Sequence, residues 1–178
     1  MTRPLDGFAD IHCHDLSRAT SGTAVVSVSP GTELQPGGTY SVGIHPWDTV
    51  ELPSLSTLKA LVAAACDPRV VAVGECGFDT LRGGTPEFQR RVFDFQARLA
   101  ERVGKPLIIH AVRSDAALIA AKRRLHPSQR WIIHGFRGNH VQAGQLLREG
   151  FSLSLGKRFN PAVPAVVPPD RLYRESDS

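Results

Sequence analysis

The sequence first of all lacks the features of a membrane or secreted protein. No apolar run in its 178 residues approaches the ~20 residues that a membrane-spanning helix needs. The first ten residues, MTRPLDGFAD, contain no apolar segment typical of a secretory signal. The three cysteines cannot all pair within the chain, which favours free thiols. No repeat or linker is visible, so we expect a cytoplasmic protein with a single domain over residues 1–178.

Charge is unevenly distributed along the chain. Residues 1–89 contain five Lys or Arg and ten Asp or Glu, whereas residues 90–178 contain sixteen and seven. An acidic first half suits metal binding, and a basic second half suits a polyanionic partner. Solvated helix faces explain the same charges equally well, so charge alone leaves both interpretations open.

Short apolar runs alternate with helical stretches over the whole chain. Most runs are rich in Val, Ile and Leu without polar alternation, which is typical of parallel strands buried on both faces. The runs are Phe8–His12, Ala24–Val28, Tyr40–Ile44, Val70–Gly74, Pro106–His110, Trp131–His134, Phe151–Leu155 and Arg171–Glu175. Eight such strands with intervening helices predict a (β/α)8 barrel of the α/β class.

Helix ends can be predicted between these runs. The expected N-caps are Ser54 or Ser56, Thr85, Ser114 and Asn139, and the expected ends lie near Cys66, Gly104, His126 and Gly150. Residues 15–23 are too few for a packed crossover helix, and residues 156–170 contain four prolines. We therefore expect abbreviated crossovers after strands 1 and 7. We also expect uncovered apolar strand surface there, and with it either self-association into a homo-oligomer or marginal stability.

Two histidines alternate along the first predicted strand. Asp10, His12 and His14 occupy every second position, so they point to one face about 6.5 Å apart, while Cys13 points the other way. Two imidazoles at one strand end can chelate a divalent ion, and Asp10 could orient one of them. A lone HxH pattern is weak evidence, because core and surface histidines are common.

The same kind of residue recurs where four later runs end. Glu75, His110, His134 and Asp177 each lie at the end of a predicted strand. In a barrel all these ends open onto one rim, where active sites lie. A satisfied polar residue explains any one of these positions, but core packing gives no reason for the repetition. The pattern therefore favours a metal centre at that rim.

Six segments resemble the signature blocks of TatD-family metal-dependent hydrolases, and they occur in the family's order. They are ADIHCH, VGIHPWD, AVGECGFD, KPLIIHAVR, WIIHGFRGN and RESD, from residue 9 to residue 177. The resemblance implies a (β/α)8 TIM-like barrel of the metal-dependent hydrolase type, with two divalent ions of Mg²⁺, Mn²⁺ or Zn²⁺. His12 and His14 would hold the first ion, His110 and His134 the second, and Glu75 would bridge them.

The resemblance also implies roles in catalysis and substrate binding. Asp177 would ligate the first ion and orient or deprotonate the attacking water, so that it and Glu75 are the catalytic residues. His45 resembles a substrate contact and Arg113 a phosphate contact, and Arg137 is a further candidate cation. Members of the family cut DNA phosphodiesters, which implies DNA as the substrate, in particular single-stranded DNA.

Other functions remain open. The same scaffold could hydrolyse another ester or amide, or the chain could be a truncated remnant that binds metal with little turnover. The sequence ends one residue past Asp177, where the family continues with a loop and a helix, so we expect Asp177 to be loosely held. We expect Asp79 to cap a turn, Cys76 and Cys13 to be buried without a catalytic role, and Arg174 to point outward.

Overall fold

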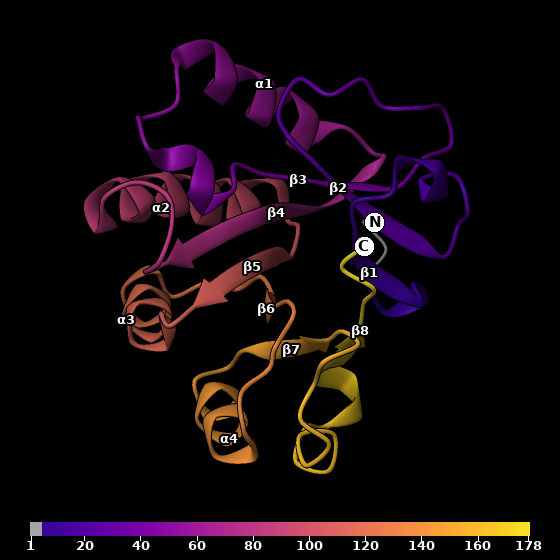
Figure 1. Cartoon of the computed structure of the whole chain (residues 1–178). Coiled ribbons are helices and arrows are strands. Elements are labelled where there is room, and N and C mark those ends of the chain that lie inside the picture. The colour runs from indigo at the N-terminus through magenta and orange to yellow at the C-terminus, as the bar shows by residue number, and fades with distance from the viewer. Residues whose placement is uncertain (1–4) are drawn as a thin grey trace.

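The computed structural model describes residues 5–178, in which eight parallel strands form one sheet in chain order (Figure 1). The strands are β1 (Asp10–Cys13), β2 (Ala24–Val28), β3 (Tyr40–Val42), β4 (Val70–Asp79), β5 (Leu107–Val112), β6 (Trp131–Ile133), β7 (Ser152–Leu155) and β8 (Leu172–Arg174). Each neighbouring pair from β1 to β8 is parallel. The predicted (β/α)8 class is confirmed.

Four α-helices connect strands within this sheet. They are α1 (Leu55–Cys66), α2 (Pro86–Val103), α3 (Asp115–Leu125) and α4 (His140–Arg148). The side chains of Ser54, Thr85 and Asn139 accept N-terminal backbone N–H groups, as predicted. Ser114 also precedes its helix, but its hydroxyl donates to the Phe78 carbonyl instead of capping. Ser114 therefore ties α3 to the end of β4.

The core has two layers, as expected for a barrel with helices outside it. Inside the barrel lies a small cluster made largely of alternate strand residues: Leu5, Ile11, Val25, Ala72, Ile108, Ile132 and Tyr173. Between strands and helices lies a larger cluster, in which Phe93 of α2 packs against Phe78 and Trp131. The inner cluster fills the barrel, so the functional site is confined to the rim.

Helical cover is uneven around the barrel. Figure 1 shows the α-helices along the top, left and bottom of the view, whereas loops flank β1 and β2 on the right. The crossovers after β1 and β7 contain only 3₁₀ turns, Leu16–Arg18 and Pro169–Arg171, which confirms their predicted abbreviation. The expected uncovered strand surface is not found, because Cys13, Ala24 and Val26 are fully buried. Ala19 and Leu34 from the adjoining loops pack on the same cluster.

The ends of the sheet meet through backbone hydrogen bonds just past β8. The Asp177 N–H donates to the His12 carbonyl at 3.1 Å, and the His14 N–H donates to the Ser178 carbonyl at 2.7 Å. This alternation continues the parallel pattern of the other strand pairs. The rim is therefore continuous between β8 and β1.

The described residues contain no helix that is both long and apolar enough to cross a membrane. Cys13, Cys66 and Cys76 are free thiols, as expected.

Candidate metal centre

Glu75 reaches the rim because the chain is irregular in the middle of β4. The pairing of β4 with β5 shifts register between Val73 and Cys76, and Gly74 adopts a φ of +131°. A Cβ at Gly74 would lie 2.3 Å from the Ile108 carbonyl oxygen, so only glycine fits there. The strand was predicted to end at Gly74, but it continues to Asp79 because its second half pairs with β5.

The carboxylate of Glu75 lies at the centre of five imidazoles. Its Oε1 atom is 2.8 Å from His110 Nδ1, 2.8 Å from His134 Nε2 and 3.0 Å from His45 Nε2. Its Oε2 atom is 3.3 Å from His12 Nε2 and 3.7 Å from His14 Nε2. The two oxygens thus face different histidines. This division matches the two ligand sets that the family resemblance implies.

Asp177 lies on the same side as the HxH pair. Its Oδ1 atom is 3.5 Å from His12 Nε2 and 3.8 Å from His14 Nε2. Asp177 was expected to be loosely held, but its backbone N–H donates a hydrogen bond to the His12 carbonyl of β1. Its backbone φ is +50°. Pairing across the end of the sheet supplies the order that sequence position alone did not suggest.

Charge in this cluster is strongly coupled. Burial by itself raises the pKa of Glu75, but the charge of His134 and hydrogen bonds from His110 and His134 hold it well below its usual range. Burial lowers the pKa of His134, but the charge of Glu75 and a hydrogen bond to Glu175 raise it to about 10. Glu75 is therefore ionised at neutral pH and available as a ligand for a cation.

Two further carboxylates orient two of the histidines. Asp79 Oδ2 is 3.1 Å from His110 Nε2, and Glu175 Oε1 is 3.2 Å from His134 Nδ1. An ionised carboxylate only accepts hydrogen bonds, so Asp79 and Glu175 favour a proton on these two ring nitrogens. The opposite nitrogens, His110 Nδ1 and His134 Nε2, point to Glu75 and are the ones that could ligate a cation after losing a proton. Carboxylate–imidazole pairs of this kind orient metal-ligating histidines in proteins.

His45 has the opposite arrangement. Its Nδ1 atom accepts the Trp47 backbone N–H at 3.1 Å, so Nε2 carries the proton in the neutral ring and points to Glu75 as a donor. A ring nitrogen that carries a proton cannot ligate a metal ion. His45 therefore suits a hydrogen bond to an anion better than metal ligation, although it lies among the other histidines.

The described residues fit a divalent ion in geometry and chemistry. Four overlapping triplets of His, Glu or Asp have ligand atoms within 4.8 Å of one another, namely His12–His14–Asp177, His12–Glu75–His134, His45–Glu75–His110 and His134–Glu175–Asp177. Both ring nitrogens of His12 are buried without a hydrogen bond. A buried imidazole in this state loses hydration without compensation, and ligation would satisfy it. Mixed nitrogen and oxygen donors suit Zn²⁺, Mn²⁺ or Mg²⁺.

Asp79 and Glu175 were not predicted as partners of the ligands. Asp79 accepts the backbone N–H groups of Leu81 and Arg82, which confirms the predicted turn cap. It also accepts the Trp47 indole N–H at 2.7 Å and contacts His110. Glu175 lies two residues before Asp177, so in an extended segment both side chains point to the same face. This spacing could have predicted that Glu175 lies near the metal centre. For Asp79 the signal was only its place at the end of β4.

Asp10 acts on the backbone and not on an imidazole. Its carboxylate accepts the backbone N–H groups of His12 at 3.2 Å and Ser176 at 3.1 Å. It also accepts the Ser176 hydroxyl and forms an ion pair with Arg18. The hypothesis that Asp10 orients a histidine ring is wrong in that detail, because the carboxylate joins β1 to the segment after β8. Cys13 and Cys76 are buried with their thiols directed at backbone carbonyls.

The remaining predicted residues lie at or near the rim. Arg113 follows β5 with a φ of +50° and is exposed, and its side chain has no hydrogen bond or ion pair within residues 5–178.

A cavity of about 360 Å³ beside the cluster is lined by His14, Ser27, Val28, Ser29, Gly43, His45, Trp47, Asp48, Glu75, His110, His134 and Asp177. Arg174 is exposed as expected, with its guanidinium 4.9 Å from the ring centre of Phe159.

The fold and the cluster together define a (β/α)8 barrel with a candidate metal centre at the carboxyl ends of its strands. The family model described as TatD related DNase matches residues 10–178. The chain therefore belongs to the TatD related DNase family, which confirms the family resemblance.

Similarity to individual proteins agrees with this family. The chain is 31% identical over 149 residues to the 3'-5' ssDNA/RNA exonuclease TatD of Erwinia amylovora, covering 78% of this chain and 57% of that protein. It is 32% identical over 154 residues to the uncharacterized metal-dependent hydrolase TatD of Mycobacterium tuberculosis, with the same coverage. The chain thus spans little more than half the length of these relatives.

A solved structure shows the same architecture. The TatD homolog YjjV of Escherichia coli K12 superposes with a TM-score of 0.75 at 28% identity, covering 97% of this chain and 80% of that chain. A hydrolase TatD family protein from Entamoeba histolytica superposes with a TM-score of 0.76 at 19% identity, covering 96% and 73%. The latter likeness concerns the fold alone.

Proposed function

We propose that this chain is a divalent-metal-dependent hydrolase that cleaves phosphodiester bonds of single-stranded DNA. One observation carries the proposal. The two oxygens of Glu75 face two separate histidine sets, His12 with His14 and His110 with His134. That arrangement suits a carboxylate bridging two cations. The single-stranded substrate is supported by the exonuclease activity named for the Erwinia amylovora relative.

Six residues would hold the ions. His12, His14 and Asp177 would ligate the first, His110 and His134 the second, and Glu75 would contribute one oxygen to each. When bound, such ions lower the pKa of a water towards ~7 and stabilise charge on the transferred phosphoryl oxygens. Zn²⁺, Mn²⁺ and Mg²⁺ all remain suitable on donor chemistry.

The remaining steps fall to side chains of the chain itself. Asp177 is partly exposed in the cavity and would accept the proton of the attacking water. The water oxygen would form the new bond to phosphorus, the bond to the leaving oxygen would break, and that oxygen would take up a proton from Asp177 or from solvent. His45, with Nε2–H directed at the cluster, would donate a hydrogen bond to a phosphate oxygen. Arg113 would pair with the phosphate charge at the edge of the rim.

The two alternative hypotheses have less support. Hydrolysis of a carboxyl ester or amide has no specific feature in its favour. An inactive remnant was suggested by a loosely held Asp177, but the backbone of Asp177 is hydrogen-bonded to β1. The basis for self-association is likewise reduced, since β1 and β2 are covered. The free thiols suit a reducing compartment such as the cytoplasm.

Metal removal tests the proposal. Protein treated with a chelator and then dialysed should lose hydrolysis of 3'- or 5'-labelled single-stranded DNA, and adding Mn²⁺, Mg²⁺ or Zn²⁺ should restore it. Labelled RNA, a carboxyl ester and an amide run in parallel define the substrate class. Turnover of DNA that survives chelation, or turnover of the ester alone with every metal, would reject the proposal.

A further inference from the structure

We propose that a second cavity beside the metal centre binds a further phosphate of the substrate, so that the protein selects a polynucleotide over a compound with a single phosphodiester. This inference rests on the proposed function and names the feature that would give it its substrate class. The cavity, called here the basic cavity, has a volume of about 340 Å³. It is lined by Gly135, Phe136, Arg137, Gly156, Lys157, Arg158, Glu175, Ser176, Asp177 and Ser178.

The basic cavity adjoins the metal centre directly. Its lining comes from the segments that follow β6, β7 and β8, which open onto the same rim as the ligands. Asp177 lines both this cavity and the one beside the histidines. A substrate whose reacting phosphate lies at Glu75 would therefore place its next phosphate on the far side of Asp177.

Three cations of the basic cavity have no partner in the described chain. Arg137, Lys157 and Arg158 are exposed, and within residues 5–178 their side chains form no hydrogen bond or ion pair. The acidic side chains of the lining are directed elsewhere, since Glu175 contacts His134 and Asp177 contacts His12. Unpaired cations that converge on a cavity attract an anion, and guanidinium groups match the geometry of phosphate oxygens.

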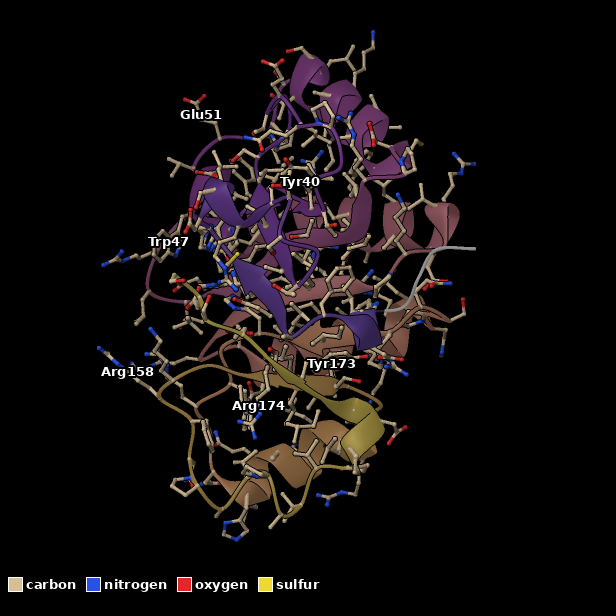
Figure 2. All side chains as sticks on the ribbon, turned by 90° about the vertical axis from the view of Figure 1, so that its right-hand side faces the viewer. Tyr40, Trp47, Glu51, Arg158, Tyr173 and Arg174 are labelled. Carbon is tan, nitrogen blue, oxygen red and sulfur yellow. The ribbon has the colours of Figure 1, made fainter. Side chains whose placement is uncertain are left out.

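The segment that carries Lys157 and Arg158 is irregular but well anchored. Beyond these two residues, Arg174 stacks on Phe159, and Val163 and Val167 are buried in the main core. Figure 2 shows Arg158 on the same side of the barrel as Trp47, which lines the cavity beside the metal centre. Binding a phosphate there would require little ordering of the backbone, which favours affinity.

Two glycines keep the floor of the basic cavity open. A Cβ at Gly135 would lie 3.4 Å from Glu175 Oε1, and a Cβ at Gly156 would lie 3.7 Å from Glu175 Cγ. Both glycines are therefore close to Glu175, and neither has a side chain that would cover it. The cavity therefore stays open above Glu175, whose charge is offset by its contact with His134.

The test compares two triple variants that lose the same charge. The cavity variant carries Arg137→Ala, Lys157→Ala and Arg158→Ala. The control variant carries Lys59→Ala, Arg91→Ala and Arg98→Ala, three exposed cations of α1 and α2 without a partner in the described chain. Each protein is assayed with Mn²⁺ on a labelled ten-residue oligothymidylate and on bis(4-nitrophenyl) phosphate, which has one phosphate. Oligothymidylate binding is measured separately by fluorescence anisotropy at increasing salt.

The cavity variant should lose about tenfold or more in kcat/KM on the oligonucleotide, because one charge-assisted hydrogen bond is worth that factor. Its kcat/KM on the single-phosphate compound should stay within about twofold, since the metal ligands are untouched. The slope of log affinity against log salt should become shallower by about 0.7 for each phosphate that the variant no longer neutralises. The control variant should match the wild type in all three measurements.

Equal losses in the two variants, or equal losses on both substrates, would overturn the inference. Failure of the proposed function is recognised separately, because wild-type protein would then cleave neither phosphodiester. The anisotropy measurement needs no turnover and would still decide the inference. A wild-type affinity and salt slope in the cavity variant would reject it.

Discussion

The two arcs of the barrel hold their share of the metal centre by different means. Glu75 and His110 lie on β4 and β5 and His134 directly follows β6, and α2 and α3 pack on these strands from outside. His12, His14 and Asp177 come from β1 and the segment after β8, where the crossovers have only 3₁₀ turns. We refer to these as the helical arc and the loop arc.

Packing against helices holds the strands of the helical arc, and hydrogen bonds between strand ends hold those of the loop arc. In the helical arc, Phe93 of α2 packs on Phe78 of β4 and Trp131 of β6. In the loop arc, Asp10 joins His12 to Ser176, and the backbone of Asp177 pairs with β1. A ligand can therefore be held at a barrel rim without a helix behind it, provided that polar groups connect the neighbouring strands.

The largest expected effect comes from the residue that joins both arcs. Glu75→Gln should lower kcat/KM on single-stranded DNA by about a thousandfold or more, because it removes the charge facing both histidine sets. Far-ultraviolet circular dichroism should show the same secondary structure as the wild type. Glu51→Gln, at an exposed position, is the control and should retain full activity. Near-wild-type turnover of the Glu75 variant would show that catalysis does not need Glu75 to join the two arcs.

Packing in the helical arc should dominate stability. Phe93→Ala should lower the free energy of unfolding by about 3–5 kcal/mol, because the side chain is 1% exposed and leaves a cavity. Phe95→Ala on the same helix should change it far less, since Phe95 is 37% exposed. Urea denaturation measures both. Similar losses for the two variants would mean that α2 does not hold its strands by burial.

Within the helical arc, Asp79 should act on a ligand at a distance. Asp79→Asn should weaken metal binding about 10–100-fold, because the carboxylate orients His110 and sets its tautomer. Competition with a metal-sensitive dye measures the affinity. Asp67→Asn, which removes a carboxylate paired with Arg69 away from the rim, is the control. An unchanged metal affinity in the Asp79 variant would show that Asp79 caps the turn after β4 but does not orient His110 for metal binding.

The smallest effect is expected when an equivalent ion pair is removed from each arc. Asp10→Asn weakens the junction of β1 with Ser176 and should lower kcat about two- to tenfold, since catalysis is sensitive to small misplacement of its groups. Asp94→Asn breaks the pair with Arg124 in the helical arc and should leave kcat unchanged. Steady-state kinetics at saturating metal compares them. An equal response would contradict the claim that hydrogen bonds between strand ends hold the loop arc.

Patterns among neighbouring residues in the sequence predicted the positions of the strands and helices. Apolar runs located all eight strands, and capping residues located the helix starts, because both signals lie within a few residues of the elements they define. The residues proposed as ligands were singled out by their recurrence at strand ends, and the structure brings them together around Glu75. The longer β4 could not be predicted in the same way, because its second half depends on pairing with β5.

Contacts between distant segments account for what was missed. The orientation of the His110 ring depends on Asp79, and that of the His134 ring on Glu175, 41 residues away in sequence. Cover over β1 and β2 comes from loop residues such as Leu34, which have no periodic signal. The order of Asp177 depends on its pairing with His12, at the opposite end of the chain.

Diffraction from crystals loaded with Mn²⁺ would test most directly whether both arcs meet around bound ions. The account predicts two anomalous peaks about 3.5–4 Å apart, one on each side of the Glu75 carboxylate. One peak should contact His12, His14 and Asp177, and the other His110 and His134. Peaks remote from Glu75, or no peak at saturating Mn²⁺, would contradict it.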